Sequence, residues 1–189
     1  MLDQVSKEWI TLIAAGIAAI SGLVGVFLNI RNAVTLPQRG ALRKILENDI
    51  NGISSCIYLI VAYSKKMSNA KSDAAFRNFL KLAEEQRQVL NKLRSNARYS
   101  LWGLDQGFRE LRSTPMYISH YKHSRSGKAA KKIIYISTRL RVSLDRAIIA
   151  AYVAGLPPGR WSRLQVWFWG WRLRTYFAKG RKRAEPHNS

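Results

Sequence analysis

Few side chains of this chain could do chemistry on their own. Cys56 is the single cysteine among 189 residues, and no histidine or acidic neighbour points to a nucleophile or a metal ligand. His120 and His123 have H-x-x-H spacing, but a metal site needs three or four ligands and no cysteine or carboxylate lies nearby. Glu84 and Glu85 are adjacent, so on a helix their carboxylates point about 100° apart. We therefore predict that Cys56 packs in a core, that the glutamates are solvated, and that no metal is bound.

The recurring catalytic motifs are missing as well. The sequence contains no P-loop, no G-x-G-x-x-G, no G-x-S-x-G and no zinc-binding quartet. It also offers no nucleophile next to a base. We predict that the protein is not an enzyme and uses no cofactor, which leaves charge and apolar pattern as the informative features.

The first of these features is a basic stretch. No acidic residue occurs from Leu111 through Leu144, where tyrosines and a histidine alternate with cations. Cations bind backbone phosphates and rings stack on unstacked bases, so the composition predicts a site for an anionic partner such as nucleic acid. The alternative is a solvated loop that touches acidic lipid. The residues predicted to bind the anionic partner are Arg112, Lys122, Arg125, Lys128, Lys131, Lys132, Arg139 and Arg141.

The second feature is an aromatic and basic segment near the C-terminus, at 159–183. Four of the six tryptophans occur there, among arginines and lysines. Such a helix suits the headgroup layer of a membrane, with rings at the acyl boundary and guanidinium groups on phosphate. Alternatively it packs on a helical bundle with its arginine stems over the rings, or Lys179–Arg183 binds nucleic acid. The residues predicted at the membrane interface are Trp161, Trp167, Trp169, Trp171, Arg163 and Arg174.

The third feature is the run Trp9–Ile30, which carries no charge over 22 residues. A helix of this length reaches about 33 Å, and the hydrocarbon core of a bilayer is about 30 Å thick. The run therefore predicts a transmembrane helix. A buried helix of a soluble core and a cleaved signal peptide are the alternatives, although no small-x-small cleavage site follows the run.

The flanks of this run predict its orientation. Lys and Arg are in excess after it, so residues 31–189 are expected in the cytoplasm and residues 1–8 on the other side of the membrane. Small residues recur along the run and would let a second copy or a partner helix approach closely, or they reflect only the usual composition of membrane helices. The predicted packing residues are Ala14, Ala18, Gly22 and Gly25.

The remaining sequence predicts an all-α fold. Apolar residues at helical spacing and end signals indicate helices over 35–67, 72–97, 131–155 and 160–183. A short kinked helix is expected at 98–111, with Trp102 facing inward and a break at Thr114–Pro115. Residues 31–156 would form a basic helical bundle and 184–189 a disordered tail. The apolar stretch 50–63 is short for a second span, and we expect it in the core rather than re-entering the membrane.

Net charge limits the functions that fit this layout. The formal charge is +21, and because Lys7, Asp3 and Glu8 give −1 to residues 1–30, residues 31–189 carry +22. Such a domain should have an anionic partner. The order of the Trp9–Ile30 span, the basic domain and the aromatic-basic end resembles the small transmembrane effectors of bacterial antiphage systems, including those paired with retron reverse transcriptases.

That resemblance implies a toxin-like effector that perturbs the membrane and is restrained by a nucleic-acid-containing defence complex. It rests on the order of parts alone, so it assigns no residue a role. The alternative is a membrane-tethered adaptor that recruits nucleic acid or an acidic protein.

Overall fold

The computed structural model describes residues 21–22, 38–44, 46–47, 49–96, 101–121 and 127–184. Every regular element among these residues is a helix, which confirms the all-α prediction. The chain divides into two compact units, Met1–Ala41 and Leu42–Ser189.

In the first unit, Ser21, Gly22 and residues 38–41 are helical. The rest of the predicted span, with the small residues Ala14, Ala18 and Gly25, lies outside the described residues, as do residues 1–8. Gly22 is exposed, and no other part of the chain lies within 4 Å of the position that a Cβ would take there. Among the described residues, no helix has both the length and the apolar character that crossing a bilayer requires.

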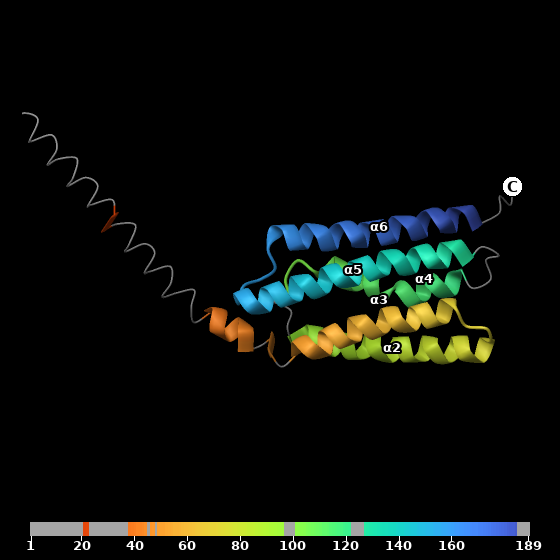
Figure 1. The fold of residues 1–189 in the computed structure, drawn as a ribbon, viewed down its shortest axis with the longest axis horizontal. Coiled ribbons are helices and arrows are strands. Elements are labelled where there is room, and N and C mark those ends of the chain that lie inside the picture. Colours follow the sequence, from red (N-terminus) through yellow and green to blue (C-terminus); the bar gives the residue numbers. More distant parts are fainter. Residues whose placement is uncertain are drawn as a thin grey trace, which may run out of the picture. The chain divides into compact units, whose positions relative to one another are not determined.

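The second unit is a bundle whose long helices run back and forth along one direction (Figure 1). Helical residues 49–68 are followed by α2 (Asp73–Asn96), α3 (Asp105–Arg112), α4 (Thr114–His120), α5 (Gly127–Ala154) and α6 (Arg160–Ala184). Among α2 to α6, the most extensive packing joins α5 to α6, and α6 also packs on α3. The aromatic-basic segment is therefore part of the bundle, and the predicted tail beyond Ala184 lies outside the described residues.

Local signals set several helix ends. Ser72 accepts a hydrogen bond from the backbone N–H of Ala75 (3.2 Å), which caps α2 as its sequence predicted. At the end of α5, Gly155 takes a positive φ of 61°, and the N–H of Leu156 reaches back to the carbonyl of Ala151 (3.2 Å). This αL termination favours glycine, and Pro157 prevents the helix from continuing.

Three predictions about the middle of the chain were wrong. The break expected at Thr114–Pro115 is the first turn of α4, where proline is tolerated because the N–H it lacks would have no partner inside the helix. The helix α3 begins at Asp105 rather than at residue 98. The helix α5 begins at Gly127 rather than Lys131, since Lys128, Ala129 and Ala130 are good helix formers.

One continuous core holds the second unit together. Every helix contributes side chains with almost no exposed surface, and burial of each stabilises the fold by about 1.5–3 kcal/mol. The stretch 50–63 is part of this core, as expected, and so is Cys56. Representative core side chains are Ile53, Ile57, Ile60, Leu90, Phe108, Leu111, Ile133, Leu140, Leu144, Val166 and Leu173.

Polar side chains are also buried between the short helices and their neighbours. The hydroxyl of Tyr117 donates to the carboxylate of Glu110 (2.8 Å), and burial together with this carboxylate raises the pKa of Tyr117. The hydroxyls of Thr114 and Ser137 lie 3.0 Å apart and join α4 to α5. Because buried polar groups are costly without partners, these pairs favour a single register for α3 and α4.

Glycine at position 107 should be required for α6 to pack. A Cβ there would lie 2.2 Å from Cγ1 of Val166 and 3.3 Å from Cδ2 of Leu144. We expect Gly107→Val to destabilise a 42–189 fragment by about 1–3 kcal/mol, since overpacking pushes α6 and α5 away from α3. Urea unfolding followed by circular dichroism measures this change.

Gly127→Val is the matched control, because no atom lies within 4 Å of a Cβ at Gly127. It should change the free energy of unfolding by no more than about 0.5 kcal/mol. Equal effects of the two variants would contradict the packing described for α6.

Candidate membrane-binding and anion-binding surfaces

The inner side of α6 is fixed by close contact with α3 and α5. Val166 and Leu173 are buried, and Trp169 packs partly against the core. Between them, a Cβ at Gly170 would lie 3.7 Å from Cα of Gly107 on α3, so the two backbones cross closely. This crossing determines which of the many aromatic side chains of α6 face inward.

Further along α6, Phe177 packs on α4. Its ring stacks on Tyr117 at 4.1 Å between centroids, and His120 meets it edge-on at 5.4 Å. A Cβ at Gly180 would overlap the hydroxyl of Tyr121. Aromatic contacts therefore hold the second half of α6 in the same orientation as the first half.

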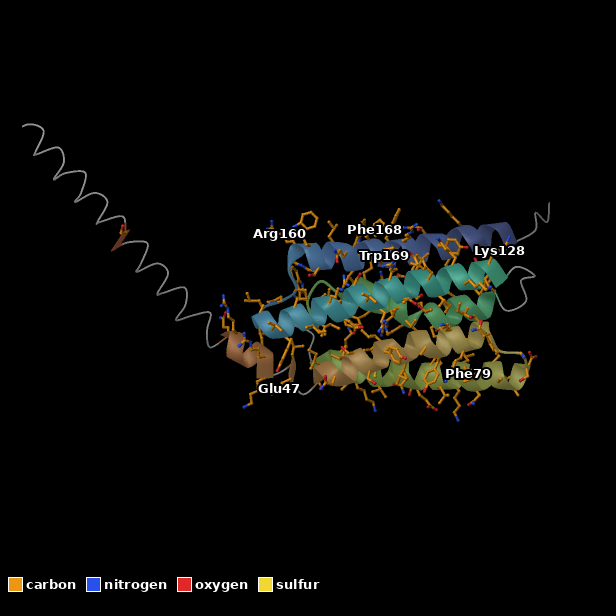
Figure 2. All side chains as sticks on the ribbon, in the orientation of Figure 1. Glu47, Phe79, Lys128, Arg160, Phe168 and Trp169 are labelled. Atoms are coloured by element: carbon orange, nitrogen blue, oxygen red, sulfur yellow. The ribbon has the colours of Figure 1, made fainter. Side chains whose placement is uncertain are left out.

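The outer side of α6 and the neighbouring Trp102 carry large exposed apolar side chains, most of them aromatic. We call this set of side chains the aromatic surface. Its members retain between 40 and 78% of their accessible surface. Trp167 and Trp171 lie one turn apart with parallel rings at 6.2 Å, and Phe168, beside Trp169, is on the same stretch of α6 (Figure 2). The aromatic surface consists of Trp102, Trp161, Leu164, Trp167, Phe168 and Trp171.

Arginines lie directly against these rings. The guanidinium of Arg163 is 4.7 Å from the ring centroid of Trp102, and that of Arg172 is 6.0 Å from the ring centroid of Phe168. Arg174 is exposed. Guanidinium groups held beside exposed rings give the surface the mixed character that a membrane interface requires.

The six residues predicted at the membrane interface differ in how exposed they are in the structure. Trp161, Trp167 and Trp171 are exposed, whereas Trp169 packs on the core and Arg163 is half-buried. Trp102, which was expected to face inward, is 61% exposed, so that prediction was wrong. Nothing in the order of residues marks Trp102 as exposed, because its position depends on Arg163, which is distant in sequence.

A second surface follows the exposed side of α5, and we call it the α5 stripe. Its residues are spaced three or four apart on the helix until Arg139, and the cations of Lys132 and Arg139 lie 5.3 and 5.4 Å from the ring centroid of Tyr135. The residue Arg146 continues the stripe, although it was not among the predicted binding residues. The α5 stripe consists of Lys128, Lys132, Tyr135, Arg139 and Arg146, and the exposed Lys131 lies beside it.

Two predicted residues lie away from this stripe. Arg112 on α3 donates to Asn91 on α2, and burial together with the nearby Arg94 lowers its pKa. Arg141 pairs with Asp145 (3.4 Å) and covers the ring of Tyr58. These two arginines support packing between helices, while Lys122 and Arg125 lie outside the described residues.

The cysteine and the glutamate that were first considered for chemistry are engaged in packing and in an ion pair. Cys56 is buried, and burial raises the pKa of its thiol, which disfavours the reactive thiolate. Glu84 pairs with Arg87 on the helix surface. Within the described residues no group of three or more histidine, cysteine or acidic side chains could hold a metal ion; His123 lies outside them.

Comparison of the chain with protein-family models, with curated proteins and with solved structures finds no match. What the protein does must therefore be inferred from its own side chains.

Binding of a polyanion to the α5 stripe should depend steeply on salt. We expect the 42–189 fragment to bind a single-stranded oligonucleotide at low salt and to weaken as salt rises, because phosphate contacts release counterions. In the variant Lys128→Gln/Lys132→Gln/Arg139→Gln, the negative slope of log K against log[salt] should become shallower by about 2–3. Fluorescence anisotropy at several salt concentrations measures the slope.

A control with the same loss of charge separates the stripe from net charge. Arg77, Lys81 and Lys92 are exposed on α2, and their replacement by Gln should change the slope much less. Equal slopes for both triple variants would mean that the oligonucleotide is attracted by the whole domain and not by α5.

Proposed function

We propose that this protein is a non-enzymatic effector anchored in the bacterial inner membrane through the predicted span Trp9–Ile30. Its helical bundle would lie in the cytoplasm and act on the bilayer through the aromatic surface. The α5 stripe would bind an anionic partner, a nucleic-acid-containing defence complex, which restrains the effector until release.

The observation that carries this proposal is the uneven distribution of exposed apolar side chains. Among the described residues, nine of the thirteen large exposed ones belong to α6, to the last turns of α5, to the loop that joins them, or to Trp102. Besides the aromatic surface, they include Ile149, Val153 and Leu156. Monomeric soluble domains rarely gather apolar groups in this way unless the surface binds something.

Tryptophan and arginine favour a bilayer as the bound surface. Tryptophan rings are amphipathic and concentrate at membrane interfaces, and arginine keeps its charge on lipid phosphates while its stem remains in the apolar layer. A protein partner would need a complementary acidic and apolar face, whereas an anionic bilayer offers both features at once.

The first residues of the Leu42–Ser189 unit contact the last turn of α5. Arg43, next to the start of the Leu42–Ser189 unit, donates a hydrogen bond to the backbone carbonyl of Val153, close to the start of α6. Within the Leu42–Ser189 unit, Arg43 therefore lies beside the exposed Val153, close to the exposed Leu156 in sequence.

The α5 stripe supports the second candidate function, a membrane-tethered adaptor that recruits nucleic acid or an acidic protein. Its cations line a folded, solvent-facing helix and do not need the membrane to find anions. The two candidates share the anchor and differ in whether the aromatic surface harms the bilayer.

Removing exposed rings should weaken membrane binding without unfolding the bundle. We expect Trp161→Ala/Trp167→Ala/Trp171→Ala to lower partitioning of the 42–189 fragment onto phosphatidylglycerol liposomes at least tenfold, because each ring loses burial in the interface. Co-sedimentation measures partitioning, and circular dichroism checks the fold. Val89→Ala/Met116→Ala removes exposed apolar groups elsewhere and should bind like the parent; unchanged binding of the tryptophan variant would contradict membrane docking.

Production of the full chain alone distinguishes effector from adaptor. As an effector without its partner, it should collapse the membrane potential and stop growth, and the triple tryptophan variant should restore both. A potential-sensitive dye and colony counts, at matched protein levels, measure the outcome. Normal growth of cells that contain abundant parent protein would favour the adaptor.

A further inference from the structure

A shallow groove opens where α6 begins, at one end of the aromatic surface. It is lined by Gly103, Arg160, Arg163, Leu164 and Trp167 and has a volume of about 460 Å³. Two cations and two apolar side chains thus line one open depression, and such a mixture suits a ligand with an anionic end and an apolar end.

The guanidinium of Arg163 is fixed in this groove. It stacks on Trp102 at 4.7 Å, and its stem passes over Gly103, where a Cβ would lie only 2.3 Å from its Cδ. Gly103 also has a φ of 84°, which other residues rarely adopt. The backbone at Gly103 therefore provides the space that holds Arg163 against the ring.

Arg163 is held in place without an acceptor. Its Nε is buried and has no hydrogen-bond partner, and neither Arg163 nor Arg160 forms an ion pair with any other described residue. The Nε atoms of Arg87 and Arg112 are also buried without a partner, so what points to a ligand here is the unpaired charge of Arg163 and Arg160 beside the groove. An oxyanion that accepts charge-assisted hydrogen bonds satisfies it best.

We propose that this groove binds the phosphate of an anionic phospholipid headgroup. Arg160 and Arg163 hold the phosphate, and Leu164 and Trp167 contact the glycerol and the first acyl carbons. The groove is continuous with the aromatic surface through Trp167, so a lipid in it lies at the same depth as the inserted rings. This assignment rests on the proposed membrane function and adds a defined lipid site to it.

The test uses the full chain in nonionic detergent with short-chain phosphatidylglycerol, and calorimetric titration measures the dissociation constant. The parent should prefer phosphatidylglycerol to phosphatidylcholine. Arg163→Gln should weaken phosphatidylglycerol binding at least tenfold, and Trp102→Leu should weaken it several-fold, because the guanidinium loses its platform. The exposed ring of Trp102 lies outside the core, so the second variant keeps the fold.

Arg77→Gln is the charge-matched control, since Arg77 is exposed on α2 and does not line the groove. It should change binding less than twofold. Equal losses in Arg163→Gln and Arg77→Gln would overturn the groove and indicate diffuse attraction, while leaving membrane docking through the tryptophans intact.

Two further ligands identify the source of the phosphate. Glycerol 3-phosphate should bind far more weakly than the lipid, and a single-stranded oligonucleotide should bind Arg163→Gln as well as the parent. If either ligand shows the same dependence on Arg163 as phosphatidylglycerol, the groove is a general phosphate or nucleic-acid site and the lipid assignment is wrong.

Discussion

The close crossing of α6 over α3 at Gly170 and Gly107 is the contact on which the surfaces of this protein depend. Aromatic residues occur all around α6, so its sequence alone does not define an inner side. The crossing turns Val166 and Leu173 inward and leaves Trp161, Trp167 and Trp171 outside. A larger side chain at Gly107 would separate the helices and remove the constraint that divides packing rings from exposed rings.

Much of the fold could be predicted because it depends on local patterns, whereas the surfaces depend on distant contacts. The cap at Ser72, the end of α5 and the core position of residues 50–63 follow from neighbours in sequence. The exposure of Trp102 and the burial of Trp169 do not, because they require the register of α6 on α3. Thr114–Pro115 was misread because proline both ends and begins helices, and only the turn at Ser113 distinguishes the two cases.

Repulsion among the many cations destabilises the folded domain, and burial of apolar side chains outweighs this repulsion. Residues 31–189 carry +22, and a pair of like charges about 4 Å apart costs about 1 kcal/mol in water. Each fully buried aliphatic side chain returns about 1.5–3 kcal/mol, so a core spread over every helix tolerates the repulsion. Some cations also form ion pairs within the domain: Arg141 pairs with Asp145, and Arg94 pairs with Asp105. The exposed cations of the α5 stripe have no such match among the described residues, which is why an anionic partner would stabilise the domain.

The position of the two surfaces on one helix pair affects how they would act together. α5 and α6 pack along each other, and the turn between them, which begins with the αL residue Gly155, is stiffened by Pro157 and Pro158. Neither helix can therefore rotate alone without losing the shared core. A bulky polyanion bound along the α5 stripe would also fix the orientation of the aromatic surface, and could hold it away from a bilayer without covering any tryptophan. Restraint by such a partner would then require only its size and its charge, and no conformational change within the bundle.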